Sequence, residues 1–139
     1  MAKKIISMPH LQFDINKKLD KQKKKRFFQF VKDNFGKIMN TGTDHIAISL
    51  REHKKDSLNL GRAKDNEHVC FMNLDIRIGR SVKQKRELVR SYVKGIDKFF
   101  GVEKKNQYIT FTSHNGKDFH LYEKSLENWI KNDDPLKKT

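Results

Sequence analysis

A proline and a pair of arginines are the residues in this chain whose types fit proton-transfer chemistry on a small anion. Pro9 is one of only two prolines, and it directly follows Met8. If translation starts at Met8 and that methionine is removed, Pro9 carries a free secondary amine, which is both a base and a nucleophile. In a partly desolvated pocket beside arginines, this amine has a lowered pKa and can take up a proton near pH 7. If the chain starts at Met1, the nitrogen of Pro9 belongs to a peptide bond and has no basicity.

The two arginines are Arg77 and Arg80, which lie between an apolar segment and a segment with helical periodicity. Ser81 and Gln84 have the spacing of a capping box, so a helix is expected to begin directly after Arg80. The N–H groups of a first helical turn attract anions, and arginine forks bind carboxylates. Spacing alone leaves two interpretations open, a carboxylate site or two surface residues at a strand-to-helix turn.

Hydrophobic periodicity predicts the elements that would position these residues. Strands are expected at residues 8–15, 45–50, 69–76 and 107–113. The third is the most continuously apolar, as expected for a central strand whose two faces are both covered. The first helix is expected to begin after Asp20, its N-cap, and the second helix is expected to end at Gly101. Two weaker expectations are a short edge pairing at residues 58–61 and a terminal helix at residues 119–130.

The two halves of the chain resemble each other. Phe13-Asp14-Ile15 matches Leu74-Asp75-Ile76, and Lys21-Gln22-Lys23 matches Lys83-Gln84-Lys85. The order strand, helix, strand therefore occurs twice, and each right-handed crossover makes its two strands parallel. The predicted fold is α+β, with two pseudo-symmetric βαβ units that form one four-stranded mixed sheet and place two helices on one face. The other face is most simply covered by further copies of the chain.

This repeat predicts where the proline and the arginines lie. A pseudo-two-fold axis would place the first and third strands side by side and antiparallel. Pro9, at the start of the first strand, would then lie beside the segment from Arg77 to Arg80 at the end of the third.

The composition is that of one basic domain. The chain has 139 residues, of which 31 are basic and 17 acidic, giving a formal charge of +14. Such a charge suggests nucleic acid or another anionic surface as a partner. The lysines are spread along the chain, however, and the densest run, residues 17–26, includes a helix start, where cations oppose the helix dipole. This pattern favours a solvated basic face over a nucleic-acid footprint.

Several further features set boundaries. No run of about 18 apolar residues could span a membrane, and residues 1–7 are too short for a signal peptide, so a cytoplasmic protein is expected. The single cysteine, Cys70, is expected to be a buried thiol. No histidine spacing suggests a metal site, and no cofactor is expected. Residues 1–8 are interpreted as a leader or a mis-assigned start, 9–131 as a single domain and 132–139 as a loose tail.

These residues resemble the tautomerase superfamily, whose members begin at an amino-terminal proline and are built from paired βαβ units. The resemblance covers residues 9 to about 129 and is fullest to the branch that resembles cis-3-chloroacrylic acid dehalogenase. The features that carry it are Pro9, Thr41-Gly42-Thr43-Asp44-His45, and the span from Leu60-Gly61 to Arg77-Ile78-Gly79-Arg80. It implies a tautomerase/MIF-like fold and a homotrimer. It also implies that Pro9 is the base and that Arg77 and Arg80 hold the substrate carboxylate.

The chain departs from the dehalogenase pattern at the residues that activate water. A histidine late in the first helix is missing, a tyrosine is replaced by Thr110, and the position of a glutamate holds Leu121. His120 or Glu123 could substitute for that glutamate after a shift of one or two residues, so both are candidate substrate-binding residues. The remaining residues, a proline base and two arginines that hold a carboxylate, are sufficient for keto–enol tautomerisation of a 2-oxo acid.

Two functions are therefore open. The first is a tautomerase or isomerase that moves a proton on an unsaturated or 2-oxo carboxylate, which the residues favour. The second is a non-catalytic protein of the same fold that binds nucleic acid or an acidic partner through its basic surface.

Overall fold

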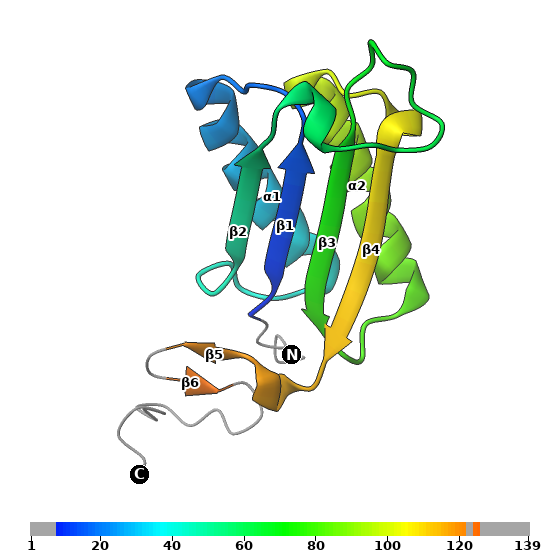
Figure 1. Ribbon diagram of the computed structural model, residues 1–139. Helices are drawn as coiled ribbons and strands as arrows, with labels where there is room; N and C mark the ends of the chain where they lie inside the picture. Colours follow the sequence, from blue (N-terminus) through cyan, green and yellow to red (C-terminus); the bar gives the residue numbers. More distant parts are fainter. Residues whose placement is uncertain (1–7, 122–123, 126–139) are drawn as a thin grey trace.

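The computed structural model describes residues 8–121 and 124–125. Its main sheet has the strand order β2-β1-β3-β4, formed by β1 (His10–Ile15), β2 (Ala47–Glu52), β3 (Cys70–Arg77) and β4 (Gln107–His114). Helices α1 (Lys21–Met39) and α2 (Val82–Phe100) both cover the same face of this sheet (Figure 1). The predicted architecture of one mixed sheet with two helices on one face is confirmed.

The pairing of the strands follows the repeat. β1 is parallel to β2, and β3 is parallel to β4, so each half is a βαβ unit. The halves meet where β1 and β3 pair in the antiparallel direction, with His10 opposite Asp75 and Ile15 opposite Cys70. The predicted antiparallel contact between the first and third strands is therefore confirmed.

Local side-chain chemistry sets the helix ends. The Asp20 carboxylate accepts a hydrogen bond from the Lys23 backbone N–H at 2.9 Å and begins α1. Ser81 and Gln84 form the complete capping box at the start of α2. Gly101, with φ of 70°, ends α2 in the left-handed conformation that glycine adopts without a Cβ clash. All three predicted helix boundaries are confirmed.

The core lies between the helices and the sheet and is rich in aromatic rings. The ring of Phe27 in α1 lies 5.1 Å from that of Phe13 in β1 and 5.0 Å from that of Phe100 in α2, both edge-on. The buried phenol of Tyr92 donates a hydrogen bond to the Val31 carbonyl at 3.0 Å, so its polar end is satisfied. Cys70 is buried as expected, and burial raises the pKa of its thiol.

Three expectations about the strands and the terminal segment are wrong. Residues 58–61 form no strand and belong to a loop. Within residues 119–130, the described part contains a hairpin of β5 (His120–Leu121) and β6 (Lys124–Ser125) instead of a helix. Phe119-His120-Leu121 alternates with a period of two, which fits a strand. The other positions of the expected helix lie outside the described residues.

The third error concerns the central strand. β3 is not apolar on both faces, because its helix-facing residues are buried while the alternate residues on the open face include Asn73 and Asp75. The open face of the sheet is therefore largely polar. The side chains of β3 give no reason to expect an apolar cover on this face.

The two helices pack most closely where Gly95 of α2 meets Phe30 of α1. A Cβ atom on Gly95 would overlap the Phe30 ring. That ring cannot easily move, because it also lies against the rings of Phe27, Tyr92 and Phe99 at 6.2, 6.5 and 5.5 Å. Glycine at residue 95 therefore sets the distance between the helices.

We expect Gly95→Ala to lower the free energy of unfolding by about 1–3 kcal/mol, the usual cost of overpacking, despite the better helix propensity of alanine. Urea unfolding followed by circular dichroism measures the change. Gly61→Ala is the matched control, because a Cβ there meets nothing within 4 Å, and it should be neutral. Equal stability of the two variants would show that the helix interface accommodates the added Cβ atom without strain.

Candidate functional site

Pro9 lies at the end of the sheet where β1 begins and where β3 and β4 end (Figure 1). Extending the β1–β3 register by one residue places Pro9 opposite Ile76, next to Arg77. Pro9 is buried, and its carbonyl accepts a hydrogen bond from the Ala47 backbone N–H at 3.0 Å. Met8 is buried as well. The fold therefore brings the proline to the strand end that carries the arginines.

The arginines occupy the turn between β3 and α2. Arg77, Ile78, Gly79 and Arg80 line a hollow of about 270 Å³. Gly79 has a φ of 99°, a backbone conformation that side chains with a Cβ rarely adopt, so glycine is favoured at this turn. Burial is the main cause that lowers the pKa of Arg80, and the positive charge of Arg77 lowers it further.

Arg80 is held in place by the end of the other helix. Its Nη1 donates a hydrogen bond to the carbonyl of Met39, the last residue of α1, at 2.9 Å. Helix ends leave carbonyls without intrahelical partners, and a cation is favourable there. Arg80 thus has a structural role at the α1 terminus that its sequence position did not indicate, because the two residues are far apart in the chain.

That hydrogen bond uses only part of the guanidinium group. The Nε and Nη2 atoms of Arg80 are buried and have no hydrogen-bond partner among the residues that the structure describes. Buried polar atoms are nearly always paired, and an unpaired buried cation is costly. A carboxylate at this position would accept hydrogen bonds from both atoms.

Of the other two candidate substrate-binding residues, only His120 lies in the part of the chain that the structure describes. His120 lies in β5, is exposed, and makes no hydrogen bond or ion pair with Arg77 or Arg80 within the described ranges. Its hairpin lies beyond the same end of the sheet as Pro9 (Figure 1). Glu123 lies outside the described residues. The roles of His120 and Glu123 stay predictions.

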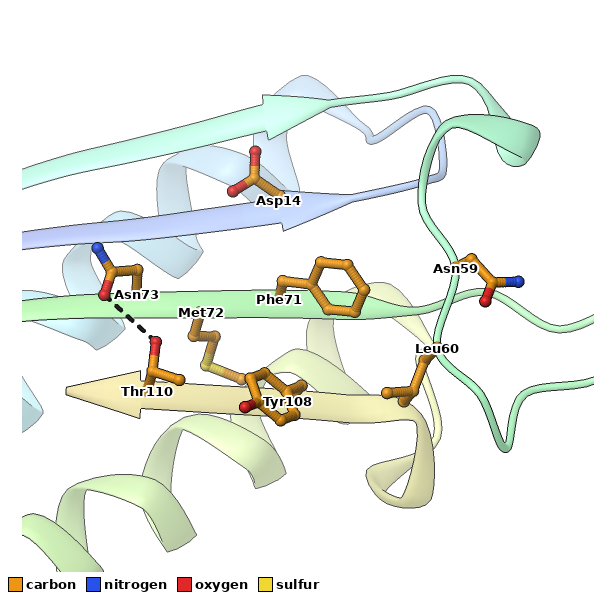
Figure 2. A pocket seen from close by; sticks show the side chains of 8 residues that line it. All are labelled: Asp14, Asn59, Leu60, Phe71, Met72, Asn73, Tyr108 and Thr110. Atoms are coloured by element: carbon orange, nitrogen blue, oxygen red, sulfur yellow. Dashed lines mark hydrogen bonds between the residues drawn. The ribbon is translucent and has the colours of Figure 1, made fainter.

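A second hollow, of about 380 Å³, lies on the open face of the sheet and at its opposite end (Figure 2). The Phe71 and Tyr108 rings meet edge-on with centroids 6.3 Å apart, and Leu60 of the loop before β3 also lines the hollow. The polar lining of this hollow includes Asp14 and Asn73. The Tyr108 side chain is 54% exposed. The loop that completes this hollow has no periodicity from which its position could be predicted.

Hydrogen bonds between neighbouring strands connect the polar side chains of the open face. Arg51 of β2 donates to both carboxylate oxygens of Asp14, at 2.7 and 3.0 Å. His53 also contacts Asp14, at 2.7 Å. Gln12 donates to Asp75 at 3.0 Å. The hydrogen bond from Arg51 is the main cause that holds the pKa of Asp14 below its ordinary value, against the opposing effect of burial.

We expect Arg51→Gln to lower stability at pH 7 by less than about 1 kcal/mol, because the pair is partly exposed to solvent. The contribution of a depressed carboxyl pKa is present above the ordinary value of 3.8 and is lost as the pH falls through the folded-state pKa. The difference from the wild type should therefore shrink at acidic pH. Urea unfolding at pH 7 and at an acidic pH near the ordinary carboxyl pKa tests this, with Arg62→Gln as the control. An equal loss at both pH values would contradict it.

Among residues 8–121 and 124–125, no group of three or more histidine, cysteine, aspartate or glutamate side chains is arranged to hold a metal ion. No helix in that part of the chain is both long and apolar enough to cross a bilayer.

Comparisons with known proteins give matches in structure alone. No protein-family model and no curated protein matches the sequence. MIF2 of Leishmania major is 14% identical with a TM-score of 0.69, over 78% of this chain and 90% of that chain. Pt0534 inactivated by 2-oxo-3-pentynoate is 14% identical with a TM-score of 0.70, over 81% and 90%.

A further match is a fused 4-OT described as a wild-type asymmetric trimer. It is 13% identical with a TM-score of 0.73, over 85% of this chain and 96% of that chain. Identities this low establish a shared fold, and the particular resemblance to the dehalogenase-like branch stays a prediction. The predicted fold itself is confirmed: this chain has the tautomerase fold, the one found in macrophage migration inhibitory factor and 4-OT.

Proposed function

We propose that the protein is a tautomerase-type enzyme that moves a proton on a small unsaturated or 2-oxo carboxylate, without a cofactor. The observation that carries this proposal is the partly unpaired Arg80 at the end of the sheet where Pro9 directly precedes β1. A partly buried cation with two unused donors fits a carboxylate. The similarity to Pt0534, which was inactivated by a 2-oxo acid, supports the substrate class.

The proposed roles follow from charge. Arg77 and Arg80 hold the carboxylate, and the Pro9 nitrogen takes a proton from the enol hydroxyl and returns it to carbon. Negative charge develops on the substrate oxygen during this transfer, and the guanidinium groups stabilise it. The same positive charges disfavour the protonated amine, which lowers its pKa towards the range in which a base works at neutral pH.

This mechanism requires that Pro9 is the mature amino terminus, because the Met8–Pro9 peptide bond removes the basicity of the nitrogen. Intact mass of the protein from its native host tests the requirement. We expect a chain that begins at Pro9. A mature chain that retains Met8 would exclude the proline mechanism.

We expect a chain that begins at Pro9 to ketonise 2-hydroxymuconate or phenylenolpyruvate, and Arg80→Gln to lower kcat/KM by about 100-fold or more, the usual effect of removing a charge-stabilising donor. Arg77→Gln should act in the same direction, whereas Arg62→Gln, in an exposed loop, should have no effect. Blocking the Pro9 amine by a preceding residue should abolish turnover.

Arg80 also caps α1, so its variant needs a stability measurement. If Arg80→Gln lowers only the free energy of unfolding and the folded protein keeps its kcat/KM, the arginine is structural and the proposed site is wrong. Normal turnover by a chain with a blocked Pro9 would likewise contradict the proposal.

We also propose that the protein assembles as a homotrimer through the open sheet face. The exposed Tyr108 and the hollow beside it offer an apolar contact on that face, and a fused 4-OT with the same fold is described as a trimer. The polar network on the face is compatible with a partner because its groups already have hydrogen-bond partners.

Sedimentation equilibrium should give three times the mass of one chain, and Tyr108→Glu should shift the protein towards single chains because a carboxylate would be buried in the interface. Val82→Glu is the matched control, since Val82 is also exposed and apolar but lies at the start of α2. A wild-type protein that sediments as one chain would refute the trimer.

A further inference from the structure

The positive charge of the protein is concentrated in its helices. α1 contains seven basic residues and one acidic residue, and α2 contains six and two. The four strands of the main sheet together contain two basic and three acidic residues. Because both helices lie on the same face (Figure 1), lysines that are spread along the sequence are gathered on one side of the folded protein.

Within this face, four cations form a row along α2. They are Arg86, Arg90, Lys94 and Lys98, all exposed and each four residues from the next. Side chains at this spacing are neighbours on a helix surface, and the row is about 18 Å long at about 1.5 Å per residue. In the described part of the chain, none of the four makes an ion pair with an acidic side chain.

The row continues into a hollow of about 330 Å³ between the end of α2 and the start of α1. Lys98 lines this hollow together with Lys17, Lys18 and Lys23. Its one acidic residue, Asp20, already accepts the helix-capping hydrogen bond from the Lys23 backbone. We call these seven basic residues the α2 track: Arg86, Arg90, Lys94, Lys98, Lys17, Lys18 and Lys23.

Two members of the α2 track support the fold: Lys17 Nζ donates a hydrogen bond to the Phe100 carbonyl at 2.8 Å, and Lys98 lies in the last turn of α2, where the helix dipole favours a cation. The clustering of the seven charges itself opposes folding. Like charges four residues apart destabilise a helix by a few tenths of a kcal/mol per pair, and lysines near the start of α1 oppose its dipole. The opposite sign of charge on a partner would turn this repulsion into attraction.

We propose that the α2 track binds the phosphate backbone of double-stranded nucleic acid without regard to sequence. A row about 18 Å long spans about five phosphates of one strand, at about 3.4 Å each along the axis. Single-strand binding relies on exposed aromatic side chains that stack on bases, and neither helix has a fully exposed aromatic residue. Membrane-surface helices insert an apolar face, but the apolar faces of α1 and α2 are buried in the core. A duplex backbone is therefore the polyanion that this surface fits best.

The test uses the whole protein and a short fluorescent DNA duplex of random sequence, with binding measured between about 50 and 200 mM salt. The test variant is Arg90→Gln/Lys94→Gln/Lys98→Gln. The control variant, Lys54→Gln/Arg62→Gln/Lys64→Gln, removes the same residue types from an exposed loop outside the α2 track. Glutamine has a helix propensity close to those of lysine and arginine, so both variants should keep their folds, which circular dichroism verifies.

We expect the logarithm of the wild-type binding constant to fall with the logarithm of salt concentration with a slope near −6 if all seven cations engage, at about 0.9 per phosphate neutralised. The test variant should lose about 2.7 from that slope and bind at least tenfold more weakly near 100 mM salt, while the control retains the wild-type slope. Both variants should keep any ketonisation activity, since neither alters the site at Pro9.

Three results would overturn the proposal. They are equal slopes for the test and control variants, tighter binding of a single strand than of a duplex of the same length, and binding to vesicles that contain phosphatidylserine without binding to the duplex.

Discussion

The antiparallel pairing of β1 with β3 is the interaction on which the rest of the structure depends. It joins the two βαβ halves into one sheet and fixes which ends of the strands lie together. Because a slip of one residue would turn Leu11, Phe13 and Ile15 out of the core, this register is strongly determined by burial. The position of Pro9 beside Ile76 and Arg77 is therefore a consequence of core packing.

The fold also fixes the position of Arg80. Its hydrogen bond to the Met39 carbonyl fastens the end of α1 to the start of α2, which holds the guanidinium in one orientation before any ligand arrives. Gln84 adds a second link, to the Ile38 carbonyl at 3.3 Å. A binding group whose orientation is already fixed loses little entropy on binding. Its unpaired Nε and Nη2 atoms are thus presented by the helix scaffold.

What could be predicted from the sequence was the local chemistry and the repeat. Asp20, Ser81 and Gly101 mark helix ends through side-chain or backbone properties that need no knowledge of the fold, and the matched halves give the topology. The Arg80–Met39 contact could not be predicted because it joins distant segments.

A basic face was expected, but its place in the fold could not be predicted for a similar reason, since it depends on both helices lying on one side of the sheet. The alternation of polar and apolar residues in β3 indicated a polar outer face. The overall hydrophobicity of the segment nevertheless suggested a strand that is covered on both faces. The hollow beside Tyr108 depends on a loop whose path has no sequence signature.

The duplication has a chemical consequence of its own. The corner that joins a strand to its helix is built twice, as residues 16–20 ahead of α1 and residues 77–81 ahead of α2, and each copy is basic and ends in a capping side chain. Beside the second copy lies the start of β1 with its proline. Beside the first lies the start of β3, where Val69 donates to Asn16 at 2.7 Å. The duplicated fold thus carries two basic corners in equivalent places, and Pro9 lies beside the second.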